Sequence, residues 1–222
     1  MLQLILFDLD GTLVDTAPDL GLALNMQRER HGLPPLPLET IRPYASHGSR
    51  GLLSVGFGLK PEDDLFGQMR EEYLDLYDEV FTRSPLLFPG IDALLSSLEE
   101  RKMQWGVVTN KPSRFTGRLL GAMGLIERAA CTVSGDDAAR PKPYPDTLLL
   151  ACEQVGVEPA QCLYVGDAER DIQAAKAAGM PSVVAMYGYI DQTDRPDEWG
   201  ADAFVNSPLS LLQLIAQPGD VC

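Results

Sequence analysis

Two acidic residues follow a short apolar run near the start of the chain. Asp8 and Asp10 come directly after Leu4–Phe7 and are followed by Gly11. Because side chains two positions apart on an extended segment point the same way, we expect both carboxylates to share one face. Gly11 has no side chain, so a ligand can approach the backbone closely there. Asp and Gly are also common turn residues, and this motif alone favours a simple turn.

A second acidic pair follows another apolar run. Asp167 comes after Leu163–Val165 and Gly166, and Asp171 lies four residues later. Asp171 also fits the first turn of a helix, where acidic side chains are favoured. Several carboxylates that meet at one edge of a sheet repel one another unless a cation neutralises them. Oxygen ligands of this kind suit Mg²⁺, so the pattern predicts a magnesium site.

Three further polar residues complete the set. Thr109 and Asn110 end an apolar run and supply a hydroxyl group and backbone N–H groups. Lys142 lies in the proline-rich segment 140–145, which is suited neither to a helix nor to a central strand. Taken alone, it would be an ordinary surface lysine. A stiff loop, however, holds a lysine in one place. Each of these residues is weak evidence alone, and it is their order along the chain that supports a functional site.

The elements that must position these residues alternate along the chain. Helical patterns between the later apolar runs each end at a glycine, as helix C-termini prefer. Alternating strands and helices predict a doubly wound α/β fold with a parallel sheet, in which ligands bind at the carboxyl ends of the strands. The expected strands are Leu4–Phe7, Trp105–Thr109, Cys131–Ser134, Leu163–Val165 and Ser182–Ala185, and the expected helices are Ser113–Met123, Thr147–Val155 and Glu169–Ala178.

The connection from Phe7 to Trp105 is far longer than one crossover helix requires. Its helical patterns predict an inserted all-helical domain over residues 15–84, between core segments 1–14 and 85–222. Pro85, Pro89 and Gly90 mark the return to the core. The expected helices of the insert are Pro18–His31, one that starts near Gly51–Gly56, and Asp63–Phe81.

Composition limits the partners. The 222 residues include 18 Lys+Arg and 32 Asp+Glu. The resulting net charge of −14 disfavours binding to nucleic acid or to an anionic membrane. The four cysteines show no C-x-x-C spacing, so no zinc or redox motif is expected. The N-terminus lacks a basic region, and no apolar run approaches the roughly 18 residues of a membrane span. We therefore expect a cytoplasmic protein, either a monomer or a homodimer.

The motifs resemble, in order, the four motifs of the haloacid dehalogenase-like (HAD) superfamily, from residue 8 to about residue 190. They are Asp8-Leu9-Asp10-Gly11-Thr12, Thr109, Lys142, and Gly166-Asp167 with Asp171. Within that superfamily the chain is similar to the phosphoglycolate phosphatase group and to the related N-acetylmuramic acid 6-phosphate phosphatases. The similarity to the first group lies in Asp15–Leu20, Val108–Pro112 and Tyr187–Tyr189, and the similarity to the second lies in Trp105–Pro112 and Trp199–Asp202.

The resemblance implies a Rossmann-like core with a mobile helical cap and a Mg²⁺-dependent phosphatase that forms an aspartyl-phosphate. It implies that Asp8 is the nucleophile and Asp10 the general acid and base. It assigns Thr109, Asn110 and Lys142 to the phosphate, with Thr109 and Lys142 also catalytic. It implies a metal site of Asp8, the Asp10 backbone carbonyl and Asp167, with Asp171 orienting the metal shell.

The substrate is expected to be a small phosphate ester, first of all 2-phosphoglycolate. Arg50 lies in the segment His47–Gly51 before an expected helix, and is placed to clamp a substrate carboxylate if it does not simply face solvent. An N-acetylmuramic acid 6-phosphate phosphatase and a phosphosugar mutase are the alternatives. Asp10 argues against a dehalogenase, and the long helical insert argues against a signalling receiver domain.

Overall fold

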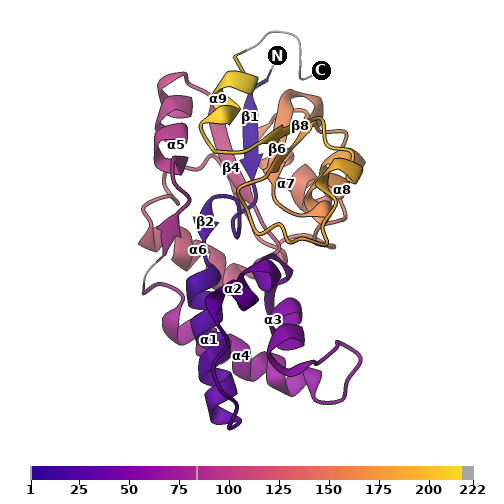
Figure 1. The fold of residues 1–222 in the computed structure, drawn as a ribbon. Helices are drawn as coiled ribbons and strands as arrows, with labels where there is room; N and C mark the ends of the chain where they lie inside the picture. Colours follow the sequence, from indigo (N-terminus) through magenta and orange to yellow (C-terminus); the bar gives the residue numbers. More distant parts are fainter. Residues whose placement is uncertain (1, 84, 217–222) are drawn as a thin grey trace. The chain divides into compact units, whose positions relative to one another are not determined.

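The computed structural model describes residues 2–83 and 85–216 (Figure 1). These residues form two compact units. The first comprises the described residues up to Val14 and from Leu87 onward, and the second comprises Asp15–Leu86. The chain returns to the first unit at Leu87 rather than at residue 85. At this boundary β3 (Leu86–Leu87) forms a two-stranded sheet with β2 (Val14–Asp15).

The first unit is built on a six-stranded sheet in the described chain, and all its neighbouring strands pair in parallel. This confirms the expected doubly wound α/β fold. One strand, β8, was not expected, because its three residues include the exposed Phe204 and form no buried apolar run. In order across the sheet, the strands are β5 (Thr132–Val133), β4 (Gln104–Val108), β1 (Leu4–Phe7), β6 (Cys162–Gly166), β7 (Ser182–Ala185) and β8 (Ala203–Val205).

Strand β1 lies at the centre of the sheet. All of its residues are buried, as is typical of a parallel strand covered on both faces. The strand order reverses at β1, with β4 and β5 on one side and β6, β7 and β8 on the other. Ligands of open α/β sheets bind beside such a reversal, at the carboxyl ends of the strands. Phe7 pairs with both Val107 and Val165, so Asp8 leaves the sheet level with the ends of β4 and β6.

Helices cover both faces of this sheet. Apolar side chains of α7 and α8 pack with Leu4, Leu6 and Tyr164 on one face, and α5 lies on the other (Figure 1). Both α7 and α8 end at a glycine with left-handed backbone, Gly156 and Gly179, as the sequence predicted. The helices of this unit are α5 (Ile91–Glu100), α6 (Ser113–Ala122), α7 (Asp146–Val155), α8 (Glu169–Ala178) and α9 (Ser210–Leu214), with short 3-10 turns at Pro159–Gln161 and Pro196–Glu198.

The second unit consists of helices. Its two long helices, α1 and α4, pack together, and the Tyr73 hydroxyl donates to the carbonyl of Leu20 over 3.3 Å. Helix α3 begins at Gly48, earlier than the sequence suggested, so Arg50 lies in its first turn and is exposed. The helices are α1 (Ala17–Arg30), α2 (Leu38–Ile41), the 3-10 helix η1 (Arg42–His47), α3 (Gly48–Phe57) and α4 (Phe66–Val80).

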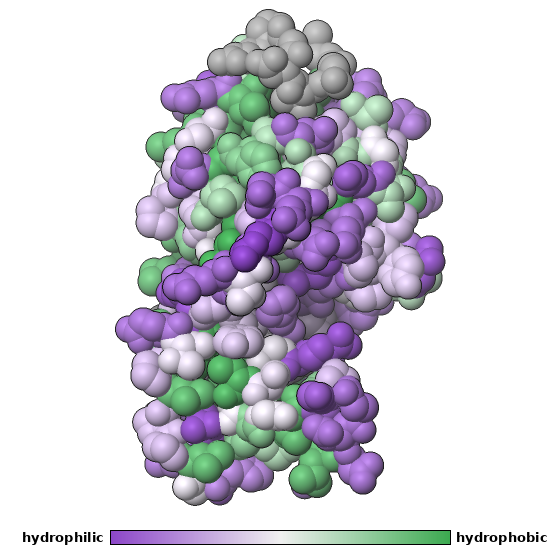
Figure 2. Space-filling view, turned by 45° about the vertical axis from the view of Figure 1, so that its right-hand side comes forward, coloured by the Kyte–Doolittle hydropathy of each residue, from purple (hydrophilic) through white to green (hydrophobic). Residues whose placement is uncertain are grey.

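On the face drawn in Figure 2, hydrophilic side chains surround scattered hydrophobic ones. Among the described helices, none combines the length and the apolar character that a membrane span requires.

Candidate active site

Asp8 is the first residue after β1. Its backbone N–H donates to the carbonyl of Val165, which extends the pairing with β6 by one residue. The carboxylate is 2% exposed, and Oδ1 accepts from the N–H of Leu9 at 2.7 Å and lies 3.0 Å from Lys142 Nζ. In the described chain, Oδ2 accepts no hydrogen bond. One oxygen of Asp8 is therefore fixed, and the other is available for chemistry.

Asp167 is the first residue after β6, and both of its carboxylate oxygens are held. Oδ1 accepts from the Thr12 hydroxyl at 3.1 Å, and Oδ2 accepts from the N–H of Tyr189 at 2.9 Å. A Cβ atom added to Gly11 or to Gly188 would overlap this side chain. Gly11 also has a φ of +90°, so glycine is needed there both for backbone conformation and for space.

Asp171 has two roles in the structure. It lies in the first turn of α8, and its Oδ2 accepts from the N–H of Ala168 at 3.0 Å, which caps the helix. Its Oδ1 lies 2.7 Å from Lys142 Nζ. Burial raises the pKa of Asp171, the Lys142 ammonium opposes this, and the Asp8 carboxylate raises it further. The net shift is upward, which reflects a carboxylate with little water and a negative neighbour.

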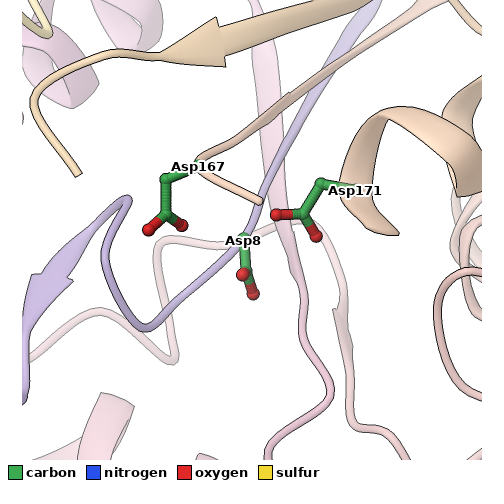
Figure 3. A group of neighbouring side chains, drawn as sticks. All are labelled: Asp8, Asp167 and Asp171. Atoms are coloured by element: carbon green, nitrogen blue, oxygen red, sulfur yellow. The ribbon is translucent and has the colours of Figure 1, made fainter. Parts of the chain in front are cut away.

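These three carboxyl groups form one cluster. Figure 3 shows the carboxyl groups of Asp167 and Asp171 on either side of Asp8. One oxygen from each lies within 4.8 Å of the others, and all three residues are buried. The donor set consists of hard oxygen atoms from three carboxylates, so the cluster is able to bind a metal cation.

Lys142 is the cation at the centre of the cluster. It is 3% exposed, and Nζ lies within 3.1 Å of four acceptors, the Val108 carbonyl, the Tyr164 hydroxyl, Asp8 Oδ1 and Asp171 Oδ1. An ammonium group has three N–H donors, so one of the four contacts is purely electrostatic. The proline-rich loop thus holds this lysine in one place, as the sequence predicted.

Tyr164 is a site residue that the sequence analysis missed. Its hydroxyl accepts from Lys142 Nζ at 2.7 Å and donates to the carbonyl of Val108 at 2.8 Å. Burial raises the pKa of Tyr164 well above 10, and the carboxylates of Asp171 and Asp8 raise it further. The hydroxyl therefore stays neutral and keeps its proton for Val108. In the sequence it resembles any core residue of a buried strand.

Asn110 contacts the backbone of Lys142 at two points. Its side-chain Nδ2 donates to the Lys142 carbonyl at 2.9 Å, and its Oδ1 accepts from the Lys142 N–H at 2.9 Å. The sequence analysis grouped Asn110 with the phosphate-binding residues. In the structure both polar atoms of the side chain hold Lys142, so the side chain has a positioning role.

Thr109 is placed to donate a hydrogen bond into the site. It follows β4 and is 2% exposed, and its Oγ1 accepts from the N–H of Lys111 at 3.2 Å. No acceptor for its hydroxyl proton occurs among residues 2–83 and 85–216. This proton is available to an oxygen of a bound anion.

Two further cations near the carboxylates were not singled out from the sequence. Lys111 Nζ lies 3.1 Å and 3.3 Å from the two carboxylate oxygens of Asp10. Burial lowers the pKa of the Arg170 guanidinium, but the carboxylates of Asp171, Asp8 and Asp167 raise it more. In the sequence, the signal for Arg170 is its position next to Asp171. The signal for Lys111 is its place in the segment Trp105–Pro112, which carries the family resemblance.

Residues 5–185 match the haloacid dehalogenase-like hydrolase family. The chain belongs to this family. It is 42% identical over 218 residues to a phosphoglycolate phosphatase of Xanthomonas campestris pv. campestris, with 96% of each chain covered. It is 40% identical over 214 residues to an N-acetylmuramic acid 6-phosphate phosphatase of Pseudomonas aeruginosa, with 96% of this chain and 95% of the relative covered.

A solved structure agrees with this assignment. A predicted phosphoglycolate phosphatase from Haemophilus somnus has a TM-score of 0.83 and 28% identity, over 97% of this chain and 98% of that one. The chain is thus an enzyme of the haloacid dehalogenase-like hydrolases, and these relatives are named as phosphatases. Because these two relatives are named for different substrates and are nearly equal in identity to this chain, overall similarity does not choose between the substrates.

Proposed function

We propose that this phosphatase hydrolyses 2-phosphoglycolate in the cytoplasm by way of an aspartyl-phosphate on Asp8. The observation that carries the proposal is the unequal use of the two Asp8 oxygens. Oδ1 is held by Leu9 and Lys142, and Oδ2 accepts no hydrogen bond in the described chain. A carboxylate fixed in this way presents one oxygen as a nucleophile.

In the first step, Asp8 Oδ2 forms a bond to phosphorus, and the bond from phosphorus to the ester oxygen breaks. Asp10 gives its proton to the departing alkoxide, which leaves as glycolate with a free hydroxyl group. Lys142 offsets the negative charge that gathers between nucleophile and phosphate, and Thr109 donates to a phosphate oxygen. These contributions are positioning and charge stabilisation.

In the second step, water attacks the phosphorus of the aspartyl-phosphate. Asp10 takes the proton of the attacking water, and the bond between phosphorus and Asp8 Oδ2 breaks. The sum of the two steps is one ester and one water converted to one alcohol and one inorganic phosphate. Asp8 and Asp10 both return to their starting states.

We propose Mg²⁺ as the cation of the acidic cluster. Asp8, Asp167 and the Asp10 backbone carbonyl would hold it, with Asp171 orienting the shell. The fit rests on three buried carboxylates whose oxygens converge within 4.8 Å. When bound, Mg²⁺ supplies positive charge that offsets the repulsion between a carboxylate and a phosphate dianion.

The experiment is an assay of phosphate release from p-nitrophenyl phosphate, 2-phosphoglycolate and N-acetylmuramic acid 6-phosphate. Each substrate is tested with Mg²⁺ and with EDTA, beside an Asp8→Asn variant. We expect Mg²⁺-dependent release that the substitution abolishes, with 2-phosphoglycolate preferred. A preference for the muramic acid phosphate would replace the substrate and keep the chemistry. No release from any of the three, with the protein folded, would refute the phosphatase proposal.

A further inference from the structure

Lys111 is a buried lysine whose charge faces the proposed acid and base. Its side chain is 5% exposed, and the Asp10 side chain that it contacts is 17% exposed. Nζ lies 3.1 Å and 3.3 Å from the two Asp10 oxygens. The Asp10 side chain is therefore more exposed to solvent than the Lys111 side chain.

The backbone of Lys111 is fixed on both sides of its Cα atom. Its N–H donates to Thr109 Oγ1 at 3.2 Å, and its carbonyl accepts from the Gly135 N–H at 3.1 Å and from the Thr116 hydroxyl at 3.3 Å. A buried side chain that starts from a fixed backbone has few positions available to its ammonium group. The location of this charge is therefore built into the fold.

Lys111 and Lys142 contact different carboxylates of the same site. Lys142 contacts Asp8, the nucleophile of the proposed reaction, whereas Lys111 contacts Asp10, which must lie within hydrogen-bond reach of the ester oxygen. Lys111 is thus beside the leaving group. An ammonium group has three N–H donors, which is the chemistry that binds a carboxylate of the leaving group.

We propose that Lys111 determines specificity by binding a carboxylate attached to the ester carbon of the leaving group. This inference rests on the proposed function and specifies its substrate class, phosphomonoesters of short 2-hydroxy acids. In 2-phosphoglycolate the carboxylate carbon is two bonds from the ester oxygen. In N-acetylmuramic acid 6-phosphate it is seven bonds away, beyond the reach of a lysine fixed beside Asp10.

A purely structural role of Lys111 makes a different prediction. If the lysine only orients Asp10, its loss slows every phosphomonoester by the same factor. If it also binds the substrate carboxylate, the loss is greater for 2-phosphoglycolate than for ethyl phosphate, which has a methyl group in place of the carboxylate. The ratio of kcat/KM between these two substrates therefore separates the two roles, because the effect on Asp10 cancels.

The experiment measures this ratio for the full-length enzyme with Mg²⁺ and for Lys111→Met, Lys111→Arg and Lys60→Met. We expect Lys111→Met to lower the ratio by about 10- to 100-fold, the range for loss of a hydrogen bond to a charged group. Lys111→Arg keeps the charge and is expected to retain more of the ratio. Lys60 is exposed in the helical unit, and its substitution controls for the loss of one positive charge.

A binding measurement covers the case in which Lys111→Met is inactive. In an Asp8→Asn background, calorimetry compares the Kd of 2-phosphoglycolate with that of ethyl phosphate, with and without Lys111→Met. We expect the preference for the carboxylate to fall in this background too. An unchanged ratio in both measurements would overturn the inference, as would a wild-type enzyme that treats the two esters alike. Failure of the wild-type enzyme to hydrolyse any ester would instead refute the proposed function.

Discussion

The two hydrogen bonds from Asn110 to the backbone of Lys142 lead to a quantitative prediction. Asn110→Ala removes both, and each neutral hydrogen bond contributes about 0.5–1.5 kcal/mol. If this energy holds Lys142 beside Asp8 in the transition state, the barrier rises by about 2 kcal/mol, or roughly 30-fold in kcat. KM is expected to change little, because both polar atoms of the side chain contact the Lys142 backbone.

A double-mutant cycle tests whether the effect passes through Lys142. Phosphate release from p-nitrophenyl phosphate is measured for Asn110→Ala, Lys142→Met and the double variant. Residues that act as one unit do not add, so Asn110→Ala is expected to cost almost nothing once Lys142 is methionine. The coupling energy is then close to the 2 kcal/mol lost by the single variant, on the order of the values for contacting residues.

The helical unit supplies a matched control. Asn25 makes the same pair of contacts with another backbone, donating to the Leu36 carbonyl at 3.0 Å and accepting from the Leu36 N–H at 2.8 Å. Asn25→Ala should therefore reduce the free energy of unfolding about as much as Asn110→Ala does, but it should leave kcat unchanged. A rise in KM with unchanged kcat for Asn110→Ala, or additive losses in the cycle, would show that Asn110 contacts the substrate instead.

Three other substitutions test separate parts of the molecule. Asp10→Asn is expected to lower kcat by about 10²–10⁴-fold for ethyl phosphate and much less for p-nitrophenyl phosphate, whose leaving group needs little protonation; equal losses would remove the acid role. Arg50→Ala tests whether Arg50 shares the substrate carboxylate with Lys111: it is expected to raise the KM for 2-phosphoglycolate about tenfold, the effect of one lost charged hydrogen bond, and an unchanged KM would leave that carboxylate to Lys111. Arg128 donates to Glu99 and lowers the pKa of that carboxyl below its usual 4.5, although burial opposes the shift. Glu99→Gln should therefore reduce the free energy of unfolding near pH 7, and this loss should shrink as the pH falls through the lowered pKa of Glu99; urea unfolding over a pH series that gave a constant loss would contradict this.

The strands that carry the site could be predicted from the sequence because they are buried on both faces. The bounds of β1 and β7 were predicted as observed, and Asp8 follows directly from the end of β1. Helix α5 was missed, although Leu94, Leu95 and Leu98 give it an apolar face. The sequence prediction has no helix between Gly90 and Trp105, where α5 lies.

Side-chain partners could not be predicted in the same way, because they depend on contacts between distant segments. The spacing of residues indicates which carboxylates share a sheet edge, but not which atom of each is already bonded. Asn110 reaches a loop 32 residues away, and Tyr164 reaches the carbonyl of Val108 across 56 residues. Both look ordinary in the sequence, one as a polar loop residue and the other as part of a buried strand.

The acidic residues show why a structural and a functional interpretation of one motif need not compete. Asp171 was a candidate helix cap and a candidate site residue, and it uses one oxygen for each, Oδ2 for the N–H of Ala168 and Oδ1 for Lys142. The cap fixes the side chain through the first turn of α8, so the oxygen that faces Lys142 cannot rotate away without breaking it. Asp8 divides its oxygens likewise, with Oδ1 bound to the N–H of Leu9. Local backbone contacts that are common at turns and helix starts are thus what hold the chemically active atoms in place.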